Sequence, residues 1–285
     1  SSRGPTPDGR IKPELLAPGS AVISLCSSLT TSNFAANPAY TRMGGSSMAA
    51  AVSGGALALL EEYLKDQKGL NTPSAALLKA LLINGAQLTK EGPSEQNGFG
   101  IMDLAGTILP LQDNSFKIAD IKDSMYDGQS LEYHFNVTDA SRPFKTTLAW
   151  TDPVSATGWG SQLVDNLDLE VEDPQGRVWL GNDFKSQGVS DSKNNVEQIC
   201  ITKPLPGQYT IRIKANHLVG DLSSDRIALV YGQVLRHETA QKIVGNNLVT
   251  ANGGSLDLTQ YNIKSSSNGK QTAAQDKAIT PGSDL

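Results

Sequence analysis

Residues 44–55 read Gly44-Gly45-Ser46-Ser47-Met48-Ala49-Ala50-Ala51-Val52-Ser53-Gly54-Gly55, and this stretch indicates the fold more clearly than any other. Ser47 opens a run from Met48 to Lys65 that is rich in Ala and Leu and has no interior proline. The run predicts a helix with Ser47 at its N-terminus. The free backbone N–H groups of that terminus would stabilise an oxyanion forming beside the Ser47 hydroxyl.

Residues 45–51 resemble the nucleophile segment of the subtilisin-like serine proteases, which reads Gly-Thr-Ser-Met-Ala-x-Pro. This chain has Ser46 in place of Thr and Ala51 in place of Pro. Neither change is serious, because proline in a first helical turn is tolerated rather than required. The site residues that the resemblance implies are catalytic Ser47 and substrate-binding Gly45, Ser46 and Met48.

Two more stretches resemble the same family. Residues 1–19, with Ser1-Ser2-Arg3-Gly4-Pro5 and Ile11-Lys12-Pro13-Glu14-Leu15-Leu16-Ala17-Pro18-Gly19, are similar to the segment that precedes the nucleophile. Residues 98–104, Gly98-Phe99-Gly100-Ile101-Met102-Asp103-Leu104, resemble the close of the catalytic domain. Taken alone, Ser47 is more simply a helix N-cap. The three patches together identify residues 1–112 as the C-terminal portion of a subtilisin-like catalytic domain with an α/β fold.

The resemblance implies a catalytic Asp and His upstream of the serine. The three histidines of the chain, His134, His217 and His237, all follow Ser47. His134 lies on the polar face of an alternating segment, which predicts a solvated strand residue. We therefore expect the Asp and His on an N-terminal part of the protease, as a partner of this chain. A start at Ser1-Ser2 fits a C-terminal piece, a processing product or an incompletely sampled gene, and each makes the isolated chain catalytically incomplete.

Two further segments complete the prediction for the helical part. Residues 21–25 predict a short buried strand. Residues 72–85 predict a second helix, with Thr72 as its N-cap and Pro73 at the first helical position. We expect the apolar face of this second helix to pack beside the nucleophile helix.

From about residue 115 the hydrophobic period changes from 3.6 to 2, which is typical of β-strands. The predicted strands are 131–137, 146–151, 167–171, 177–180, 209–215 and 227–234. Turn sequences punctuate them, so residues 113–236 are expected to form an all-β, jelly-roll-like sandwich. Segments such as 148–153 and 165–169 resemble the C-terminal sandwich domain of a subset of subtilases. Residues 237–285 are polar and predict a flexible tail or linker.

An oxygen-rich group of residues in this second part indicates a metal site. Its candidate ligands are Asp165, Asp168 and Asp183, with Asn166, Asn182 and Asp191 nearby in sequence. Carboxylates and carbonyls at loop junctions suit calcium, and the resemblance implies structural calcium in this domain. Strand alternation, however, puts Asp168 on the solvated face. No organic cofactor is expected.

Composition excludes several classes of function. A net charge of −5 argues against nucleic-acid or anionic-membrane binding. No apolar run approaches about eighteen residues, so no membrane span is expected. Cys26 and Cys200 are predicted to be buried free thiols. Asn136-Val137-Thr138 is an N-glycosylation sequence, which fits the extracellular, secreted location expected for this family.

Two functions remain open from the sequence. The first is the C-terminal portion of a secreted subtilisin-like serine endopeptidase that acts on protein or peptide substrates. The second is a non-catalytic module, on a degenerate protease scaffold, in which the sandwich binds carbohydrate or protein. Trp150, Trp159 and Trp179 could then supply a stacking platform, although Trp150 and Trp179 lie in predicted strands, where core packing is the simpler role.

Overall fold

The computed structural model describes residues 2–89, 92–94, 96–155, 160–219, 221–222, 227–234 and three later strands. The chain divides into two compact units, Ser1–Leu235 and Arg236–Leu285. The second unit contains one antiparallel sheet of β13 (Gln241–Val244), β14 (Asn247–Thr250) and β15 (Ser255–Asp257). These strands fall in the stretch for which the polar sequence predicts a flexible tail.

Three helices form in the first part of the chain. They are α1 (Ser46–Lys68), α2 (Ala75–Gly85) and α3 (Leu104–Gln112). The long α1 helix ends at Gly69, whose left-handed φ of 69° and N–H bond to the carbonyl of Leu64 close the last turn. Among the residues that the structure describes, no helix is both long enough and apolar enough to cross a bilayer.

The N-terminus of α2 differs from the prediction. The N-cap is Ser74 rather than Thr72, because the Ser74 hydroxyl accepts the N–H of Leu77 at 3.0 Å. The same hydroxyl donates to the carboxylate of Asp120. Pro73 therefore precedes the helix, and Ser74 connects the first turn of α2 to β3 (Phe116–Ile121).

Two four-stranded antiparallel sheets make up the β-rich region. The first has the order β3 (Phe116–Ile121), β12 (Ile227–Gln233), β6 (Phe144–Trp150), β9 (Val196–Ile201). The second has the order β5 (Ser130–Val137), β10 (Gly207–His217), β7 (Asn166–Glu172), β8 (Val178–Leu180). A two-residue pair, β4 (Met125–Tyr126) and β11 (Asp221–Leu222), adds a small ribbon. Every predicted strand of this region overlaps an observed one, whereas β3, β9 and the two-residue strands β4 and β11 were not predicted.

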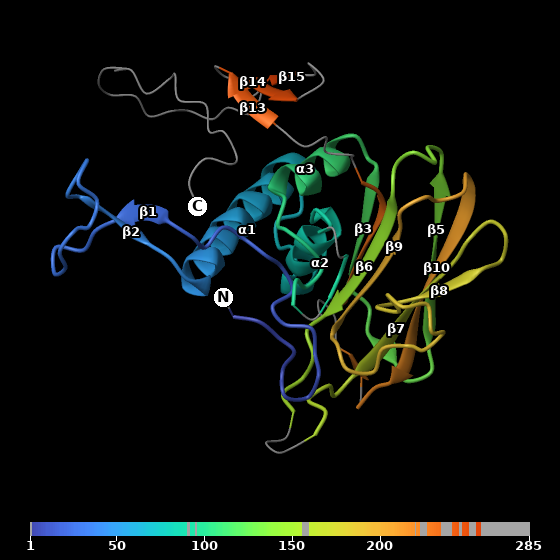
Figure 1. Ribbon diagram of the computed structural model, residues 1–285. Helices are drawn as coiled ribbons and strands as arrows, with labels where there is room; N and C mark the ends of the chain where they lie inside the picture. The colour runs from blue at the N-terminus through green and yellow to red at the C-terminus, as the bar shows by residue number, and fades with distance from the viewer. Residues whose placement is uncertain are drawn as a thin grey trace. The chain divides into compact units, whose positions relative to one another are not determined.

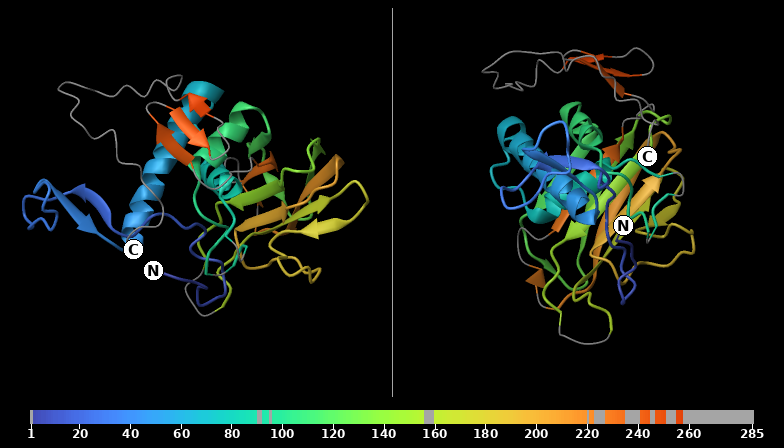
Figure 2. Two further views of the ribbon diagram at one scale, coloured as in Figure 1. Left: turned by 45° about the horizontal axis from the view of Figure 1, so that its top comes forward. Right: turned by 60° about the vertical axis from the view of Figure 1, so that its left-hand side comes forward.

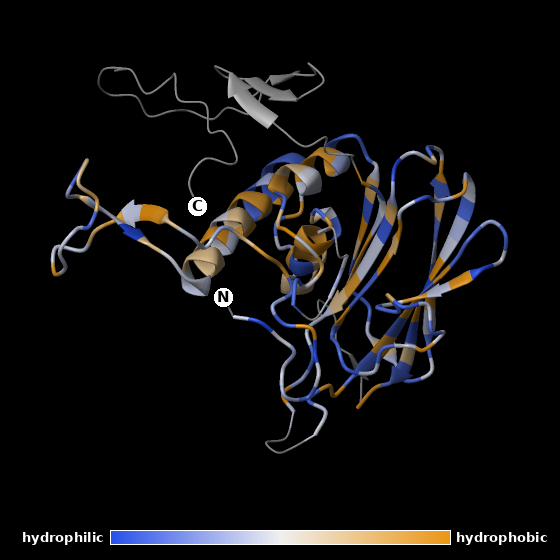
Figure 3. Cartoon of the chain, in the orientation of Figure 1, coloured by the Kyte–Doolittle hydropathy of each residue, from blue (hydrophilic) through white to orange (hydrophobic). Residues whose placement is uncertain are grey.

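The two sheets enclose one hydrophobic core. Leu148 and Leu229 from the first sheet pack with Leu169, Ile211 and Ile213 from the second, all at most 1% exposed. Apolar and polar residues alternate along several of these strands (Figure 3), as expected for strands with one buried face. The jelly-roll connectivity stays a prediction.

The helices cover the other face of the first sheet (Figure 1, Figure 2). Leu60 of α1 and Leu77 and Leu81 of α2 share a core with Ala228 and Val230 of β12. The second helix thus contacts α1, as predicted, and also the strands β6 and β12. Helical and β-rich parts are joined through a continuous apolar interior.

The predicted buried strand near residue 21 is exposed instead. It forms β1 (Val22–Leu25), which pairs only with β2 (Tyr40–Met43) in an antiparallel ribbon that extends away from α1 (Figure 1). Ile23 is 45% and Leu25 is 75% exposed. The expectation of burial was wrong because no further strand or helix of the described residues covers this ribbon.

Candidate active site

The chain enters α1 through a glycine that no other residue can easily replace. Gly45 has φ 147° and ψ 164°, a conformation that side chains disfavour. Its N–H donates to the carbonyl of Gly19 at 2.7 Å. A Cβ atom on Gly19 would lie 2.8 Å from the Gly45 carbonyl oxygen. This close backbone contact fixes where α1 begins.

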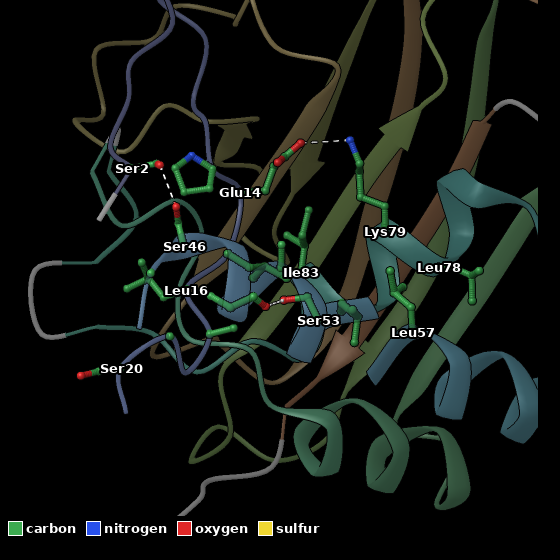
Figure 4. A pocket seen from close by; sticks show the side chains of 18 of the residues that line it. Ser2, Glu14, Leu16, Ser20, Ser46, Ser53, Leu57, Leu78, Lys79 and Ile83 are labelled. Carbon is green, nitrogen blue, oxygen red and sulfur yellow. Dashed lines mark hydrogen bonds and ion pairs between the residues drawn. The ribbon is translucent and has the colours of Figure 1, made fainter. Parts of the chain in front are cut away.

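The three residues after Gly45 point in different directions. Ser46 lines a groove, and its Oγ lies 2.9 Å from the Oγ of Ser2 (Figure 4). Ser47 lies in the first turn of α1 and is exposed to solvent. Met48 is half-buried, and its N–H donates to the Gly45 carbonyl at 3.1 Å. The N–H groups of Met48 and Ala49 both point to the Gly45 carbonyl, and Ser47 lies in the same first turn, where N–H groups have no i−4 partner within the helix.

The structure brings together the three sequence patches that resemble subtilases. Leu16 donates its N–H to the carbonyl of Gly100, and Met102 donates to the carbonyl of Leu16, both at 2.8 Å. The contact of Gly19 with Gly45 joins the first patch to the second. Segments that are about thirty to eighty residues apart in the chain therefore form one local structure around the start of α1.

A groove of about 860 Å³ runs beside this junction. Its walls come from residues 13–20 and from facing side chains of α1 and α2. Most of these side chains are apolar or small, as Leu16, Leu57 and Ile83 in Figure 4 show. The groove extends from Ser46 along the face of α1, and the Ser47 side chain lies outside it.

One ion-paired cluster interrupts the apolar wall. The carboxylate of Glu14 accepts from Lys12 and, at 3.0 Å, from Lys79 on α2. Burial alone would raise the pKa of Glu14, but the attraction of Lys79 and Lys12 outweighs it and lowers the pKa to about 2. Burial lowers the pKa of Lys12. The cluster ties the first sequence patch to α2, and the sequence contained no signal that pairs Glu14 with Lys79.

A second polar network, also missed from the sequence, joins α2 to the first sheet. Lys145 is 2% exposed, and its Nζ donates to the carbonyls of Asn84 at 3.2 Å and Ala86 at 2.5 Å. Thr147 donates to Oδ1 of Asn84 at 2.9 Å and accepts from Gln198 at 3.0 Å. Burial lowers the pKa of Lys145. A cation at the C-terminal end of α2 satisfies helix carbonyls that otherwise have no donor.

The two histidines that the structure describes lie away from Ser47. His134 is exposed on the outward face of β5, 3.3 Å from Glu132, as predicted for a solvated strand residue. His217 is exposed at the end of β10. Both belong to the second sheet, which the first sheet separates from the helices. His237 lies outside the described residues. The described histidines therefore do not approach the serine.

Two of the predicted calcium ligands already bind protein groups. Asp165 is 1% exposed, and its Oδ1 accepts the N–H of Val219 at 2.8 Å. Asp183 accepts the N–H groups of Gln187 and Gly188 at 2.8 Å, one on each carboxylate oxygen. Both carboxylates therefore cap backbone N–H groups of loops.

Asp168 departs from the sequence prediction. Alternation suggested a solvated side chain, but Asp168 is 6% exposed because loop residues cover this end of β7. It accepts from Nδ2 of Asn216 at 3.0 Å, and burial raises its pKa. The described residues contain no group of three or more His, Cys, Asp or Glu that could hold a metal. The residues proposed for calcium therefore do not fit a calcium site.

The two tryptophans that the structure describes, Trp150 and Trp179, do not form a stacking platform for a glycan. Trp150 is 1% exposed, and its Nε1 donates to the Asp165 carbonyl at 3.0 Å. The guanidinium of Arg177 covers the ring of Trp179 at 3.8 Å. Trp159 lies outside the described residues. Cys26 and Cys200 are free thiols, each half-buried rather than fully buried.

Comparison with known proteins adds independent information on the family. Residues 1–100 match the sequence model of the Subtilase family. Three curated proteins of Dictyostelium discoideum are similar to the chain, the serine protease/ABC transporter B family proteins tagA, tagD and tagB. The identity to tagA is 34% over 255 residues, covering 77% of this chain and 14% of tagA. The identities to tagD and tagB are 28%, covering 71% and 74% of this chain and 15% of each relative.

This chain thus spans 14–15% of the length of these relatives. The alignment with tagA covers 77% of the 285 residues, whereas the family model matches only residues 1–100. The likeness to tagA therefore extends into the β-rich region. A solved structure from Sulfurospirillum deleyianum aligns with 42% of this chain and 97% of its own length. The sequence identity is 11% and the TM-score is 0.22, so this likeness supports no conclusion about the fold or the function of the chain. Residues 1–100, whose three patches meet at the start of α1, belong to the subtilase family of serine proteases.

Proposed function

We propose that the chain is the C-terminal portion of a secreted subtilisin-like serine endopeptidase in which Ser47 is the nucleophile. Ser47 would attack the scissile carbonyl of a protein or peptide substrate. Its own N–H, at the N-terminus of α1, would form half of the oxyanion hole. The catalytic Asp and His would come from an upstream part of the protease. The names of the three relatives also include an ABC transporter. We propose no transporter function for this chain.

The observation that carries this proposal is the exposure of Ser47 at a rigid helix start. Gly45 and Gly19 fix the backbone there, and the Ser47 side chain is open to solvent. A nucleophile must be reachable by its base and by the substrate while its position is held by surrounding structure. Gly45, Ser46 and Met48, its neighbours in sequence, are the substrate-binding residues proposed from the family resemblance.

The uncovered face of α1 supports docking of the upstream part. Near the middle of the helix, Leu59 is 56% exposed, and Gly54 and Gly55 are exposed with nothing outside the helix within 4 Å of an added Cβ. Glycine in a helix interior costs about 1 kcal/mol relative to alanine. The packing of this chain gives no reason for that cost. Close approach of another backbone to α1 supplies one, and the groove beside Ser46 is lined by other residues of the same helix.

Complementation tests the proposal. The chain is refolded together with an upstream segment that carries the Asp and His of a related subtilase, and hydrolysis of a fluorogenic peptide library is measured. We expect activity from the mixture, none from either part alone, and none after Ser47→Ala. Ser130→Ala, an exposed serine on β5, is the matched control and should leave activity unchanged. Hydrolysis that persists in Ser47→Ala would remove the nucleophile assignment.

A further inference from the structure

The outward face of β5 carries a sequence that the protease proposal does not use. Asn136-Val137-Thr138 is the one Asn-x-Ser/Thr sequence, with x other than Pro, in the 285 residues. We propose that Asn136 is a site of N-linked glycosylation. This inference rests on the secreted location in the proposed function, because the modification occurs on chains that enter the secretory pathway.

The strand geometry presents the acceptor to solvent. Along β5 the side chains alternate, so Asn136 is exposed while Val137 is 1% exposed and belongs to the core. Gln208 lies opposite Asn136 on β10 and is also exposed. A bulky substituent on Nδ2 of Asn136 would therefore extend from the sheet without displacing core residues.

The chain just after β5 is held by its backbone, and among the described residues the hydrogen bond at Thr138 is made by its N–H. The N–H of Thr138 donates to Oε1 of Gln233 at 3.2 Å. Gln233 is 4% exposed, and its Nε2 donates to the carbonyls of Asp139 at 2.5 Å and Arg142 at 3.1 Å. The Thr138 residue itself is exposed. Replacing its hydroxyl should therefore leave the turn intact.

The proposed step is a group transfer from a lipid pyrophosphate-linked oligosaccharide, the co-reactant of the secretory pathway. A bond forms between Nδ2 of Asn136 and the anomeric carbon of the first sugar. The bond from that carbon to the pyrophosphate oxygen breaks, the lipid pyrophosphate leaves, and the amide nitrogen loses one proton. No electrons are exchanged, so no oxidant or reductant is needed.

A glycan at this position has a physical consequence for the sheet. β5 is at the edge of the order β5-β10-β7-β8, and its eight residues contain no proline. Half-buried Leu131, Tyr133 and Phe135 line its core face. Long edge strands of this kind can pair with another chain unless something blocks them. The glycan would block such pairing near the C-terminal end of β5.

The experiment expresses the full chain behind a heterologous signal peptide in eukaryotic cells, and analyses only material secreted into the medium. We expect a mobility shift on treatment with peptide N-glycosidase, with deamidation of Asn136 detected by peptide mass. Asn136→Gln and Thr138→Ala should abolish the shift, whereas Thr138→Ser and the exposed control Asn71→Gln should keep it. Secreted chain without a glycan on Asn136 would overturn the proposal.

This design separates the two proposals. The added signal peptide brings the chain into the secretory pathway whatever its natural location, and the glycosylation readout does not require protease activity. A glycosylated but inactive complementation mixture would count against the protease proposal alone. An active mixture whose secreted chain lacks the glycan would count against the glycosylation proposal alone.

Discussion

Glu14 ties the segment that precedes the candidate site to α2, and replacing it by glutamine tests that connection. The substitution Glu14→Gln keeps the size of the side chain and removes its charge. Lys12 and Lys79 then lose the carboxylate that accepts their hydrogen bonds. Glu14 is one of the groove-lining residues, so its loss should loosen the wall beside Ser46.

The size of the effect follows from the pKa of Glu14. Burial alone would raise this pKa, but Lys79 and Lys12 lower it from 4.5 to about 2. A difference of that size corresponds to about 3 kcal/mol of folding free energy. Because the pKa is lower in the folded chain, the stabilisation is fully present above the unfolded pKa of 4.5 and is lost as the pH falls through about 2.

Urea unfolding followed by circular dichroism measures this effect. At pH 7 we expect Glu14→Gln to be less stable than the parent chain by about 3 kcal/mol, and at pH 3 by about half as much. Glu62→Gln, an exposed acid on α1, is the matched control and should change stability by less than about 0.5 kcal/mol. If the free energies of unfolding of the parent chain and Glu14→Gln differ by the same amount at pH 7 and pH 3, the reasoning is refuted.

Three further outcomes follow from the structure. Lys145→Met should lower the free energy of unfolding by about 2–3 kcal/mol, because it leaves buried carbonyls at the end of α2 without a donor, and thermal melting of the variant measures this loss. Gly45→Ala should destabilise the chain by about 1–3 kcal/mol in urea unfolding, because its φ of 147° strains a side chain. Gly54→Ala, in the open part of α1, should not destabilise the isolated chain in the same urea measurement. Millimolar calcium should leave the melting temperature unchanged, since the candidate carboxylates bind protein groups, and a clear rise would restore the calcium prediction.

Much of the β-rich region could be predicted because its strands have one buried and one exposed face. β10 alternates clearly and the prediction was accurate there, whereas on β7 the strand was predicted but Asp168 is buried on the face expected to be solvated. β9 was missed because the first sheet is covered on both faces, so its residues do not alternate. Glu197 and Gln198 of β9 are each 1% exposed, and polar residues at buried positions give no strand signal.

Only part of the candidate site could be predicted, because some of its features are local in the sequence and others depend on tertiary contacts. The motif around Ser47 is local, and the glycine and small residues that specify the helix start are adjacent in sequence. The pairing of Glu14 with Lys79 and of Lys145 with α2 depends on tertiary contacts across many residues, which periodicity does not contain. Asp168 was assigned to solvent for the same reason, because the loop residues that cover it come from elsewhere in the chain.

Labelling with a fluorophosphonate probe tests the central claim most directly. The chain is incubated with the probe alone and after complementation with the Asp- and His-bearing upstream part, and the labelled position is found by peptide mass. The account predicts modification of Ser47 only in the complemented sample, and none in the Ser47→Ala variant. Labelling at another serine of this chain, or a complemented and proteolytically active sample in which Ser47 stays unmodified, would contradict it.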